Sequence, residues 1–385
     1  MTSTGLPIDG IDVAVYRFPA VGPEADGTLS WNSTTVVTAT VHAGWWRGLG
    51  WTYSTAAAGR VITEHLAPAI TGRNVFDVLG AWSVMHRACR NLGTRGLVMQ
   101  AVSAVDIALW DLKARVLDIS LAALFGRATD TVPIYGSGGF TTLTDTQLAD
   151  QVHQWKAAGC QAMKIKIGQS WGTDIDRDIA RVNEFRELAG PGVELMVDAN
   201  GGYTVGQARR VGASLDRLGV VWFEEPVSSD DLAGLAQVRG AVHCDVAAGE
   251  YAADLYDSAQ LCPVLDCLQL DVTRCGGYTG WLRGAVLAQA HNLQISAHCA
   301  PSLHAHVAAA APNLRHVEWF IDHARLEPLL VDGVPIAAKG QLQPDDATPG
   351  HGMTIGAPAA EYRVAPPPEQ DNFGTPAELP IGGSP

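Results

Sequence analysis

The spacing of hydrophobic and polar positions changes along the 385-residue chain. Residues 11–60 alternate between apolar and polar side chains around turn residues such as Gly22 and Pro23, which predicts a small antiparallel sheet. Residues 98–116 carry apolar side chains at helical spacing with no Gly or Pro, which predicts a long buried helix. We therefore expect residues 1–130 to form an α+β capping domain.

From residue 132 onward, short apolar runs alternate with longer amphipathic stretches, a pattern typical of βα units around a parallel sheet. The runs lie at 132–135, 162–167, 193–197, 220–223, 245–248, 267–270, 293–297 and 315–317. Eight units in about 190 residues predict an α/β fold, a modified TIM (β/α)₈-type barrel, over residues 131–330. Residues 331–365 are expected to return to the capping domain, and the Pro- and Gly-rich residues 366–385 to form a loose tail.

The composition narrows the class of protein. Hydrophobic residues make up 47% and charged residues 17%, which favours a globular chain over a disordered one. With 26 Lys and Arg against 40 Asp and Glu, the formal net charge is −14, so neither a nucleic acid nor a membrane is an expected partner. The seven cysteines lack metal-type spacing, and we find neither a signal peptide nor a membrane-spanning stretch, so we expect a cytoplasmic protein.

Six consecutive predicted strands end on an ionisable residue. These residues are Asp198, Glu224, Glu250, Asp271, His298 and Glu318. The carboxyl ends of all strands in a (β/α)₈ barrel open on one face, where reactive groups gather. Residues far apart in the sequence are therefore expected to meet at one barrel mouth.

Asp198, Glu224 and Glu250 follow one another at intervals of 26 residues. Three buried carboxylates repel one another unless a cation neutralises them. An all-oxygen ligand set selects a hard ion, and Mg²⁺ is favoured because it retains positions for water or a substrate carboxylate. The alternative is that each acid caps the next helix or pairs with a surface Arg, which suits a single acid better than an evenly spaced triplet.

Other ionisable residues are candidate acids and bases. Lys164 and Lys166 share one face of their strand. Their mutual repulsion and partial burial are expected to lower the pKa of at least one, which makes Lys166 a candidate base. Asp271 and His298 end adjacent strands, where a carboxylate fixes the tautomer of an imidazole. Glu318, if protonated, could donate a hydrogen bond to a substrate carboxylate. The alternatives are solvated lysines on an exposed strand and structural roles for His298 and Glu318.

With these residues the sequence resembles the enolase superfamily, and within it the mandelate racemase subgroup. The motifs that carry the resemblance are SAVDIALWDLKAR in the first domain and KIK, VDAN, FEEP, AAGE, LDVTRCGG, AH and HVE in the predicted barrel. The resemblance implies that Asp198, Glu224 and Glu250 bind Mg²⁺. It also implies that the ion and a nearby acid stabilise an enediolate, formed when a proton leaves the carbon next to a substrate carboxylate.

The resemblance assigns the remaining site residues as well. It implies that Lys166 and the His298–Asp271 pair flank the reacting carbon from opposite faces. It implies further that Lys164 lowers the pKa of Lys166 and helps to hold the carboxylate, which Glu318 would contact by a hydrogen bond. A homo-oligomer is also expected from the resemblance.

Two reactions follow from the same proton abstraction. If the substrate bears a β-hydroxyl, as an aldonate or aldarate does, its loss gives a 2-keto-3-deoxy acid. Reprotonation from the far face instead gives a racemase or epimerase of an α-hydroxy acid or an amino-acid-like carboxylate. The resemblance favours the acid-sugar dehydratase, because dehydratases dominate the subgroup. A third interpretation is a barrel that binds a metabolite without catalysis. The sequence names neither the substrate nor its stereochemistry.

Substrate specificity is expected to lie in the capping domain, around residues 18–31 and 46–54. Trp51, Tyr53 and Ser54 are candidate pocket residues there, although a tryptophan near a strand end is often a core residue. The two histidines after the seventh run are interpreted as ordinary helix residues, or else as partners of the site. The residues without an assigned role are Cys299, His304 and His306.

Overall fold

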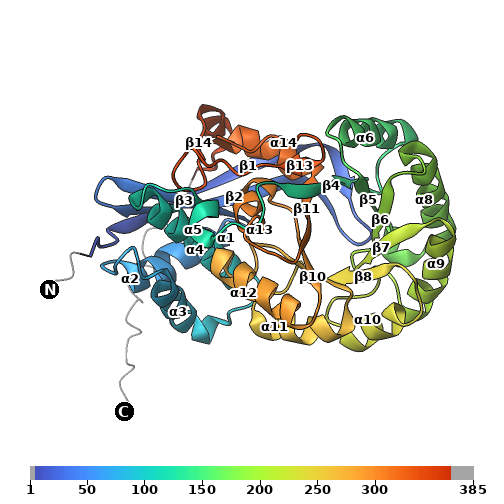
Figure 1. Ribbon diagram of the computed structural model, residues 1–385, viewed down its shortest axis with the longest axis horizontal. Coiled ribbons are helices and arrows are strands. Elements are labelled where there is room, and N and C mark those ends of the chain that lie inside the picture. The colour runs from blue at the N-terminus through green and yellow to red at the C-terminus, as the bar shows by residue number, and fades with distance from the viewer. Residues whose placement is uncertain (1–4, 366–385) are drawn as a thin grey trace, which may run out of the picture.

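The structure is a computed structural model that describes residues 5–365. The tail expected at 366–385 lies outside the described residues. A domain built on an antiparallel sheet packs beside a ring of alternating strands and helices (Figure 1). None of the helices within residues 5–365 combines the length and the hydropathy needed to cross a bilayer.

The N-terminal domain is a three-stranded antiparallel meander followed by helices. Strand β2 pairs with both neighbours, and its register with β1 shifts between Pro19 and Glu24. The elements are β1 (Gly10–Ala25), β2 (Ser30–Ala43), β3 (Trp46–Tyr53), α1 (Ala57–Val61), a π-helical turn (Ile62–Leu66), α2 (Ala67–Ile70), α3 (Val78–Ala88), a 3₁₀ turn (Arg90–Leu92), α4 (Leu97–Val116) and α5 (Leu121–Phe125). The predicted sheet and the predicted long helix are both present.

Strand β3 lies close against helix α4 because two of its residues are glycines. A Cβ atom at Gly48 would collide with the carbonyl oxygen of Ala108, and one at Gly50 with that of Ala104. Glycine in a strand often marks such a close approach of another backbone. The fully buried face of α4 therefore packs directly onto the sheet.

Eight parallel strands close into a barrel, in which the last strand pairs back with the first through partners such as Glu318 and Tyr135. The strands are β4 (Val132–Gly138), β5 (Ala162–Lys166), β6 (Glu194–Asp198), β7 (Val220–Glu224), β8 (Asp245–Ala248), β9 (Cys267–Leu270), β10 (Gln294–Ala297) and β11 (Leu314–Phe320). Each predicted apolar run corresponds to one of these strands. The expected TIM-type barrel with an N-terminal capping domain is confirmed.

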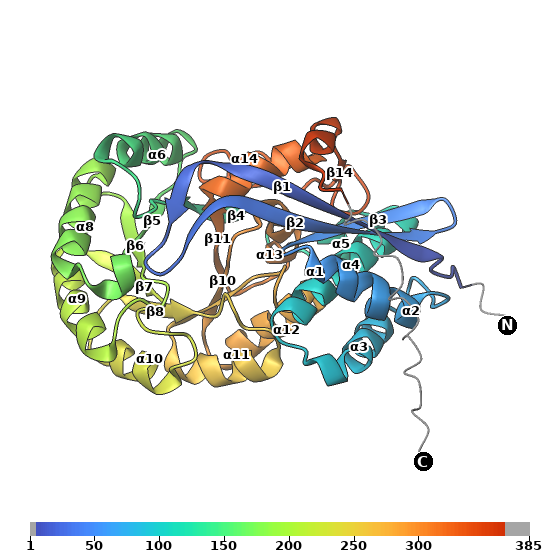
Figure 2. The ribbon, with the colours of Figure 1, turned by 180° about the vertical axis from the view of Figure 1, so that it is seen from behind.

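Helices follow the strands and cover the outside of the barrel (Figure 2). Thr144 and Thr204 cap α6 and α9, and in each case a Gln three residues later completes a reciprocal capping box. The helices are α6 (Asp145–Ala157), α7 (Gln169–Gly172), α8 (Ile175–Ala189), α9 (Val205–Arg217), α10 (Leu232–Arg239), α11 (Leu255–Leu261), α12 (Gly277–Ala290), α13 (Pro301–Ala308) and α14 (Ile321–Leu330), with a 3₁₀ turn at Cys262–Val264.

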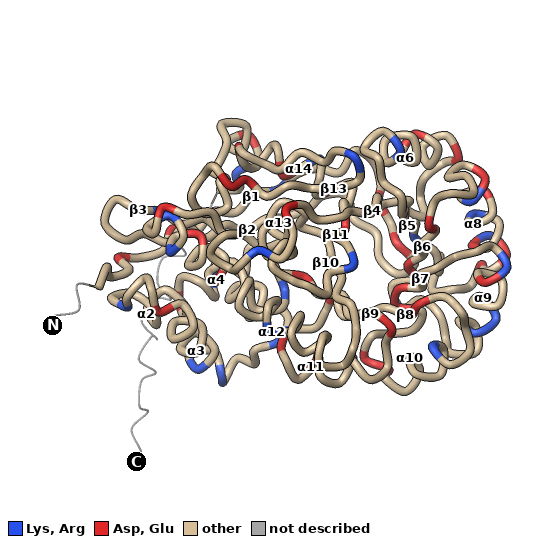
Figure 3. Tube along the Cα trace, viewed as in Figure 1, with Lys and Arg blue, Asp and Glu red and all other residues tan. Residues whose placement is uncertain are grey.

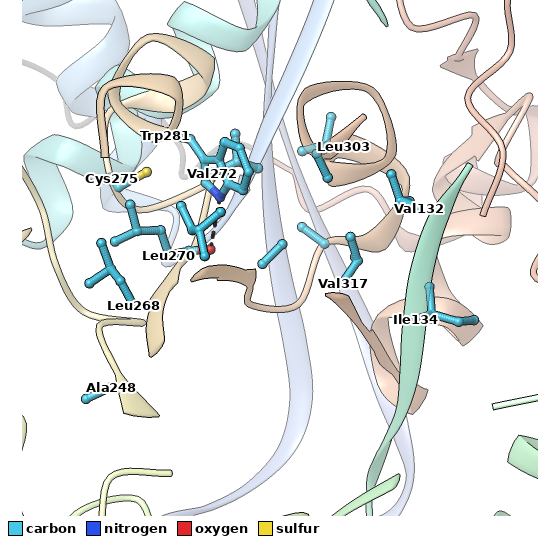
Figure 4. Close-up of a cluster of buried hydrophobic side chains, with 14 of the residues drawn as sticks. Val132, Ile134, Ala248, Leu268, Leu270, Val272, Cys275, Trp281, Leu303 and Val317 are labelled. Atoms are coloured by element: carbon cyan, nitrogen blue, oxygen red, sulfur yellow. Dashed lines mark hydrogen bonds between the residues drawn. The ribbon is translucent and has the colours of Figure 1, made fainter. Parts of the chain in front are cut away.

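Side chains alternate between the inside and the outside of the barrel. Leu268 and Leu270 of β9 belong to the large outer cluster, where Trp281 of α12 donates a hydrogen bond from Nε1 to the carbonyl of Leu270 at 3.3 Å (Figure 4). Between them, Gln269 turns inward and donates from Nε2 to the hydroxyl of Tyr135 at 3.0 Å. This alternation decides which ionisable side chains can reach the barrel mouth.

Beyond α14 the chain first pairs Gln341 and Leu342 with the barrel strand β4 and then contacts the N-terminal domain. The ring of Tyr362 stacks on Phe18 with ring centroids 4.5 Å apart, and the backbone N of Val364 donates to the carbonyl of Val15 at 2.8 Å. The elements of this segment are β12 (Val331–Asp332), β13 (Gln341–Leu342), β14 (Thr354–Ile355) and a 3₁₀ helix (Ala357–Tyr362).

Two buried acids of α4 tie the parts of the molecule together. Asp106 accepts hydrogen bonds from the backbone N of Thr279 at 2.9 Å and from its Oγ1 at 2.7 Å, at the start of α12. Asp111 accepts bonds from the backbone N of Leu49 at 2.8 Å and of His351 at 2.9 Å. Because both carboxylates are fully buried and paired, they fix α4 against the barrel, the sheet and the C-terminal segment.

Candidate active site

The ionisable residues at the barrel mouth occupy inward-facing positions of their strands. The inner cluster of the barrel contains Met196 of β6 and Trp222 of β7. Two residues further along these strands, the same inward face carries Asp198 and Glu224. Glu250 lies one position out of this alternation, after Gly249 with a φ of 127°. The inward positions near the mouth are occupied by Ser137, Lys164, Lys166, Asp198, Glu224, Asp271, His298 and Glu318.

The three acids expected to bind a metal lie together. Asp198, Glu224 and Glu250 each offer one oxygen atom, the three atoms lie within 4.8 Å of one another, and all three residues are buried. Figure 3 shows the acidic positions gathered where β6, β7 and β8 lie side by side. Asp198 accepts a hydrogen bond from the backbone N of Asn200 at 2.8 Å, and Glu224 accepts one from Nε1 of Trp222 at 2.8 Å.

This cluster fits a hard divalent cation. Ligand oxygens about 2.1 Å from an octahedral Mg²⁺ are about 3 to 4 Å apart, which small side-chain movements reach from the observed span. Among the described residues, Oε2 of Glu250 is buried and makes no hydrogen bond, although buried polar atoms normally have a partner. A cation bound by the three carboxylates would satisfy that oxygen.

Lys164 lies at the centre of the charged groups. Its Nζ atom is 2.6 Å from Oε1 of Glu224, 3.0 Å from Oε1 of Glu318 and 3.2 Å from the hydroxyl of Tyr135. Burial by itself lowers the pKa of this lysine, but the carboxylates of Glu224, Glu318 and Asp198 raise it well above its ordinary value. The side chain is therefore an ammonium ion that partly neutralises the acids of two strands.

Lys166 forms an ion pair with Asp198. Burial lowers the pKa of Lys166 and so does Lys164, yet Asp198 and the other carboxylates raise it above its ordinary value. This direction is opposite to the lowering expected from the two lysines, because that expectation counted the neighbouring ammonium and left out the facing carboxylates.

Asp271 and His298 form the expected carboxylate–imidazole pair, with Oδ2 and Nδ1 2.9 Å apart. The other oxygen of Asp271 accepts bonds from the backbone N and the Oγ1 of Thr273, both at 2.7 Å, so the carboxylate is held firmly. Burial lowers the pKa of His298, but Glu250, Glu318 and the bond with Asp271 raise it above 6.5. The Nε2 atom of His298 points toward Glu250, 3.4 Å from its Oε2.

Glu318 is held as a carboxylate, so the condition under which it could donate a hydrogen bond, a protonated side chain, is not met in this arrangement. Burial raises its pKa, but Lys164, His298 and Lys166 lower it well below the ordinary value. Its oxygens accept hydrogen bonds from Oγ of Ser137 at 2.6 Å and from the backbone N of Cys299 at 2.9 Å. Three cations and two hydrogen-bond donors around one carboxylate explain why the proton is lost.

Two residues of the site were missed from the sequence. Arg274 places Nη1 3.2 Å from Glu250 and Nε 3.5 Å from Asp271, so it links the carboxylate cluster to the imidazole pair. Glu225 follows Glu224 and is buried because its φ of 37° breaks the strand alternation that would turn it outward. The motifs LDVTRCGG and FEEP contain both residues, but only the first acid of each motif was given a role.

The β1–β2 hairpin reaches from the first domain across the loops that follow β4 and β5 (Figure 2). The carbonyl of Ala25 accepts a bond from the backbone N of Thr141 at 2.8 Å, and that of Gly27 one from the backbone N of Trp171 at 3.0 Å. A Cβ atom at Gly27 would lie 2.6 Å from the carbonyl oxygen of Ile167. The hairpin therefore packs tightly onto the barrel through its backbone.

Aromatic side chains line the contact between this hairpin and the mouth. Trp31 meets the edge of Phe140 at 5.5 Å between ring centroids, and Phe140 meets Phe320 at 5.7 Å. Cys299 packs in the same cluster, next to His298. The site thus has an apolar wall on the imidazole side.

The three candidate pocket residues lie on or directly after β3 and contact other parts of the protein. Trp51 is fully buried. Tyr53 stacks on His323 with ring centroids 3.6 Å apart and donates from its hydroxyl to Glu327 at 2.8 Å. Ser54 donates from Oγ to the side-chain oxygen of Gln100 at 2.6 Å. Their assignment to a substrate pocket stays a prediction.

The two additional histidines lie on α13 and are buried. Nε2 of His304 accepts a bond from the backbone N of Val272 at 3.0 Å, and Nδ1 lies 2.8 Å from the carbonyl of Cys299. Burial lowers the pKa of His304 to about 4 and that of His306 to about 3, so both are neutral. His304 therefore links the loop after β9, through Val272, to the loop after β10, through Cys299, and so supports the Asp271–His298 pair.

Two family models match this chain and together cover most of its length. The model of the mandelate racemase/muconate lactonizing enzyme N-terminal domain matches residues 23–126, and that of the enolase C-terminal domain-like family matches residues 147–359. The chain belongs to the mandelate racemase/muconate lactonizing enzyme family. The resemblance seen in its motifs is thereby confirmed.

Two members of the family resemble this chain over most of its length. It is 34% identical to 3,6-anhydro-α-L-galactonate cycloisomerase of Streptomyces coelicolor, over 80% of this chain and 85% of that protein. It is 33% identical to L-talarate/galactarate dehydratase of Salmonella typhimurium, over 71% of this chain and 70% of that protein.

Solved structures of the family superpose closely on the fold. A mandelate racemase/muconate lactonizing enzyme-like protein from Rubrobacter xylanophilus is 42% identical, with a TM-score of 0.90 over 93% of this chain and all of that chain. The Salmonella typhimurium dehydratase, solved with Mg and L-lyxarohydroxamate, is 28% identical, with a TM-score of 0.87 over 95% of each chain.

Proposed function

We propose that the protein is a Mg²⁺-dependent enzyme that removes the proton next to a substrate carboxylate and dehydrates an acid sugar, an aldonate or aldarate, to a 2-keto-3-deoxy acid. The observation that carries the proposal is a single barrel mouth in which three clustered carboxylates lie between the amine of Lys166 and the imidazole of His298. The substrate class is supported by the named relatives, a dehydratase and a cycloisomerase of sugar acids.

Asp198, Glu224 and Glu250 would hold the ion. The chemistry that Mg²⁺ supplies when bound is positive charge where a substrate carboxylate binds and where an enediolate gains a second negative charge. Lys164 adds an ammonium group on the same side, since its Nζ atom already contacts Glu224 and Glu318. Such stabilisation grows as the charge develops, which is what lowers the barrier to losing a weakly acidic proton.

Lys166 and His298 are the residues proposed to move protons. They extend from β5 and β10, which lie on different sides of the eight-stranded ring. The carboxylates that raise the pKa values of Lys166 and His298 include the proposed Mg²⁺ ligands Asp198 and Glu250, so a bound ion would lower both values and favour the uncharged base. The uncharged group accepts the proton from the α-carbon, and the configuration of the substrate decides which of the two does so. In dehydration a proton from Nε2 of His298 reaches the β-hydroxyl, the C–O bond breaks, water leaves and the resulting enol becomes the keto acid. Asp271 holds Nδ1 of the imidazole throughout.

The test is a panel of aldonates and aldarates incubated with the full-length chain and Mg²⁺, with 2-keto products detected as semicarbazones. We expect product from at least one acid sugar, and we expect EDTA or Lys166→Ala to abolish it. Lys156→Ala is the matched control, because that lysine is exposed on α6 and donates to the carbonyl of Leu188, at 2.7 Å. Product that persists in EDTA would contradict the proposal.

A racemase or epimerase is the second candidate, because bases on two sides of the mouth also allow reprotonation from the far face. Deuterium from the solvent would then enter the α-carbon without loss of water. A barrel that binds a metabolite without catalysis would show no α-proton exchange on any carboxylate in the presence of Mg²⁺. The exchange assay therefore separates all three functions.

A further inference from the structure

A second group of metal-binding side chains lies beside the three carboxylates. His298, Cys299 and Glu318 each offer one atom, and these atoms lie within 4.8 Å of one another. Sγ of Cys299 is 3.4 Å from Nε2 of His298, which is 3.7 Å from Oε2 of Glu318. All three residues are at most 5% exposed. Within residues 5–365, only this group and the carboxylate cluster bring three such ligands so close.

The two clusters differ in their ligand chemistry. The carboxylate cluster offers oxygen alone, which suits hard ions, whereas a nitrogen, a sulfur and an oxygen together suit Zn²⁺ and softer ions. In a tetrahedral Zn²⁺ site, metal–sulfur and metal–nitrogen bonds of about 2.3 and 2.0 Å place these two ligand atoms about 3.5 Å apart. The observed 3.4 Å between Cys299 and His298 matches that spacing.

The backbone builds this arrangement at two consecutive residues. Neighbouring side chains of an extended strand point to opposite faces, so Cys299 would normally turn away from His298. Instead Cys299 has a φ of 51° and Ala300 a φ of 41°, in the left-handed region that non-glycine residues rarely adopt. The turn brings the thiol back beside the imidazole, and the backbone N of Cys299 donates to Glu318.

The imidazole is also oriented to bind a metal. Nδ1 of His298 lies 2.9 Å from Asp271, so Nε2 is the nitrogen available to a metal, although it also lies 3.4 Å from Oε2 of Glu250. A carboxylate behind a histidine is the usual support of a metal-binding imidazole. We propose that His298, Cys299 and Glu318 bind a thiophilic divalent ion such as Zn²⁺ or Cd²⁺, and that this ion inhibits the enzyme by occupying Nε2 of His298.

On binding, the sulfur and the protonated Nε2 atom of His298 give up their protons to solvent, and the metal–thiolate and metal–nitrogen bonds form with no change of oxidation state. The binding itself does not depend on the function proposed above. Only the inhibition rests on it, because an ion on Nε2 prevents His298 from moving protons. The two claims can therefore fail separately, and they are measured separately.

Binding is tested by adding Cd²⁺ to the full-length protein in excess Mg²⁺ and recording the ultraviolet charge-transfer absorption of a Cd²⁺–thiolate bond. We expect a saturable band in the unaltered protein and its loss in Cys299→Ser and Cys299→Ala. Cys244→Ser is the matched control, because Cys244 is as buried as Cys299 but belongs to neither ligand cluster. An equal band in the Cys299 variants, or no band in the unaltered protein, would overturn the site.

Inhibition is tested with Zn²⁺ at a fixed, saturating Mg²⁺ concentration. We expect Zn²⁺ to compete with the carboxylate substrate, and Cys299→Ser to need at least about tenfold more Zn²⁺ for half-inhibition, since even the loss of an outer partner of a metal ligand costs that much. Inhibition that is equal in both proteins would overturn the inhibitory role. A Cd²⁺ band that depends on Cys299 supports the site even if no acid sugar is dehydrated.

Discussion

Replacing Lys164 with Met tests the electrostatics of the barrel mouth most directly. The ammonium group is fully buried and lies 2.6 Å from Glu224 and 3.0 Å from Glu318. Methionine keeps most of the apolar stem but leaves both carboxylates without this partner. Breaking a buried ion pair by removing one member typically costs about 3–5 kcal/mol of unfolding free energy, because a buried charge stays uncompensated.

For a barrel of this size, that cost corresponds to a Tm lower by roughly 6–20 °C. The assay is thermal unfolding followed by circular dichroism, in EDTA and again in excess Mg²⁺, with Lys156→Met as the exposed control. Because Mg²⁺ and Lys164 would both neutralise Glu224, Mg²⁺ should raise the Tm of Lys164→Met more than that of the unaltered protein. A Tm in EDTA within about 2 °C of the unaltered protein would refute this reasoning.

Three further predictions concern the capping domain, its interface and the carboxylate cluster. Gly50→Ala should lower the unfolding free energy by about 1–3 kcal/mol, because its Cβ atom meets the backbone of α4. Gly10→Ala, with no atom within 4 Å of its Cβ, should change the unfolding free energy little. Equal urea midpoints for the Gly50→Ala and Gly10→Ala variants would contradict the expected collision. Burial raises the pKa of Asp106 from 3.8 to about 7, so the folded state retains a proton that the unfolded chain has lost, and stability should fall as the pH rises from about 4 to 7. Asp106→Asn, which can still bond to both atoms of Thr279, should flatten this dependence in urea melts at several pH values, and an unchanged slope would exclude Asp106 as its source. Glu250→Gln should reduce the rise in Tm that Mg²⁺ produces, and an undiminished rise would show that Glu250 does not bind the ion.

The barrel could be predicted because its signal is local. Each strand is a short apolar run between turn residues, and the period of two assigns each side chain to a face without knowledge of the partner strand. Cys267 and Gln269 of β9 face inward, and Asp271 continues the same face at the mouth. The common direction of parallel strands then brings residues from different βα units to one end.

The charge state of the lysines could not be predicted in the same way. The pKa of Lys164 depends on Glu224 and Glu318, and Glu318 becomes a neighbour only because β11 pairs back with β4 to close the ring. The sequence shows that Lys164 and Lys166 share a face, but it does not show how many carboxylates face them. The same limit left the protonation of Glu318 open, because the sequence does not show that Lys164 lies 3.0 Å from it.

Substrate specificity is the least predictable property of this chain, because the regions expected to set it, residues 18–31 and 46–54, make contacts of two kinds that side-chain patterns do not encode. The first kind joins residues far apart in the sequence, such as Tyr53 with His323 and Glu327. The second kind uses backbone atoms, as when the carbonyls of Ala25 and Gly27 in the hairpin receive bonds from the barrel loops. Under the function proposed above, a change in the hairpin would move the apolar wall next to His298 and leave Lys166 and His298 in place, so the acid that is accepted could change without any change of an ionisable residue.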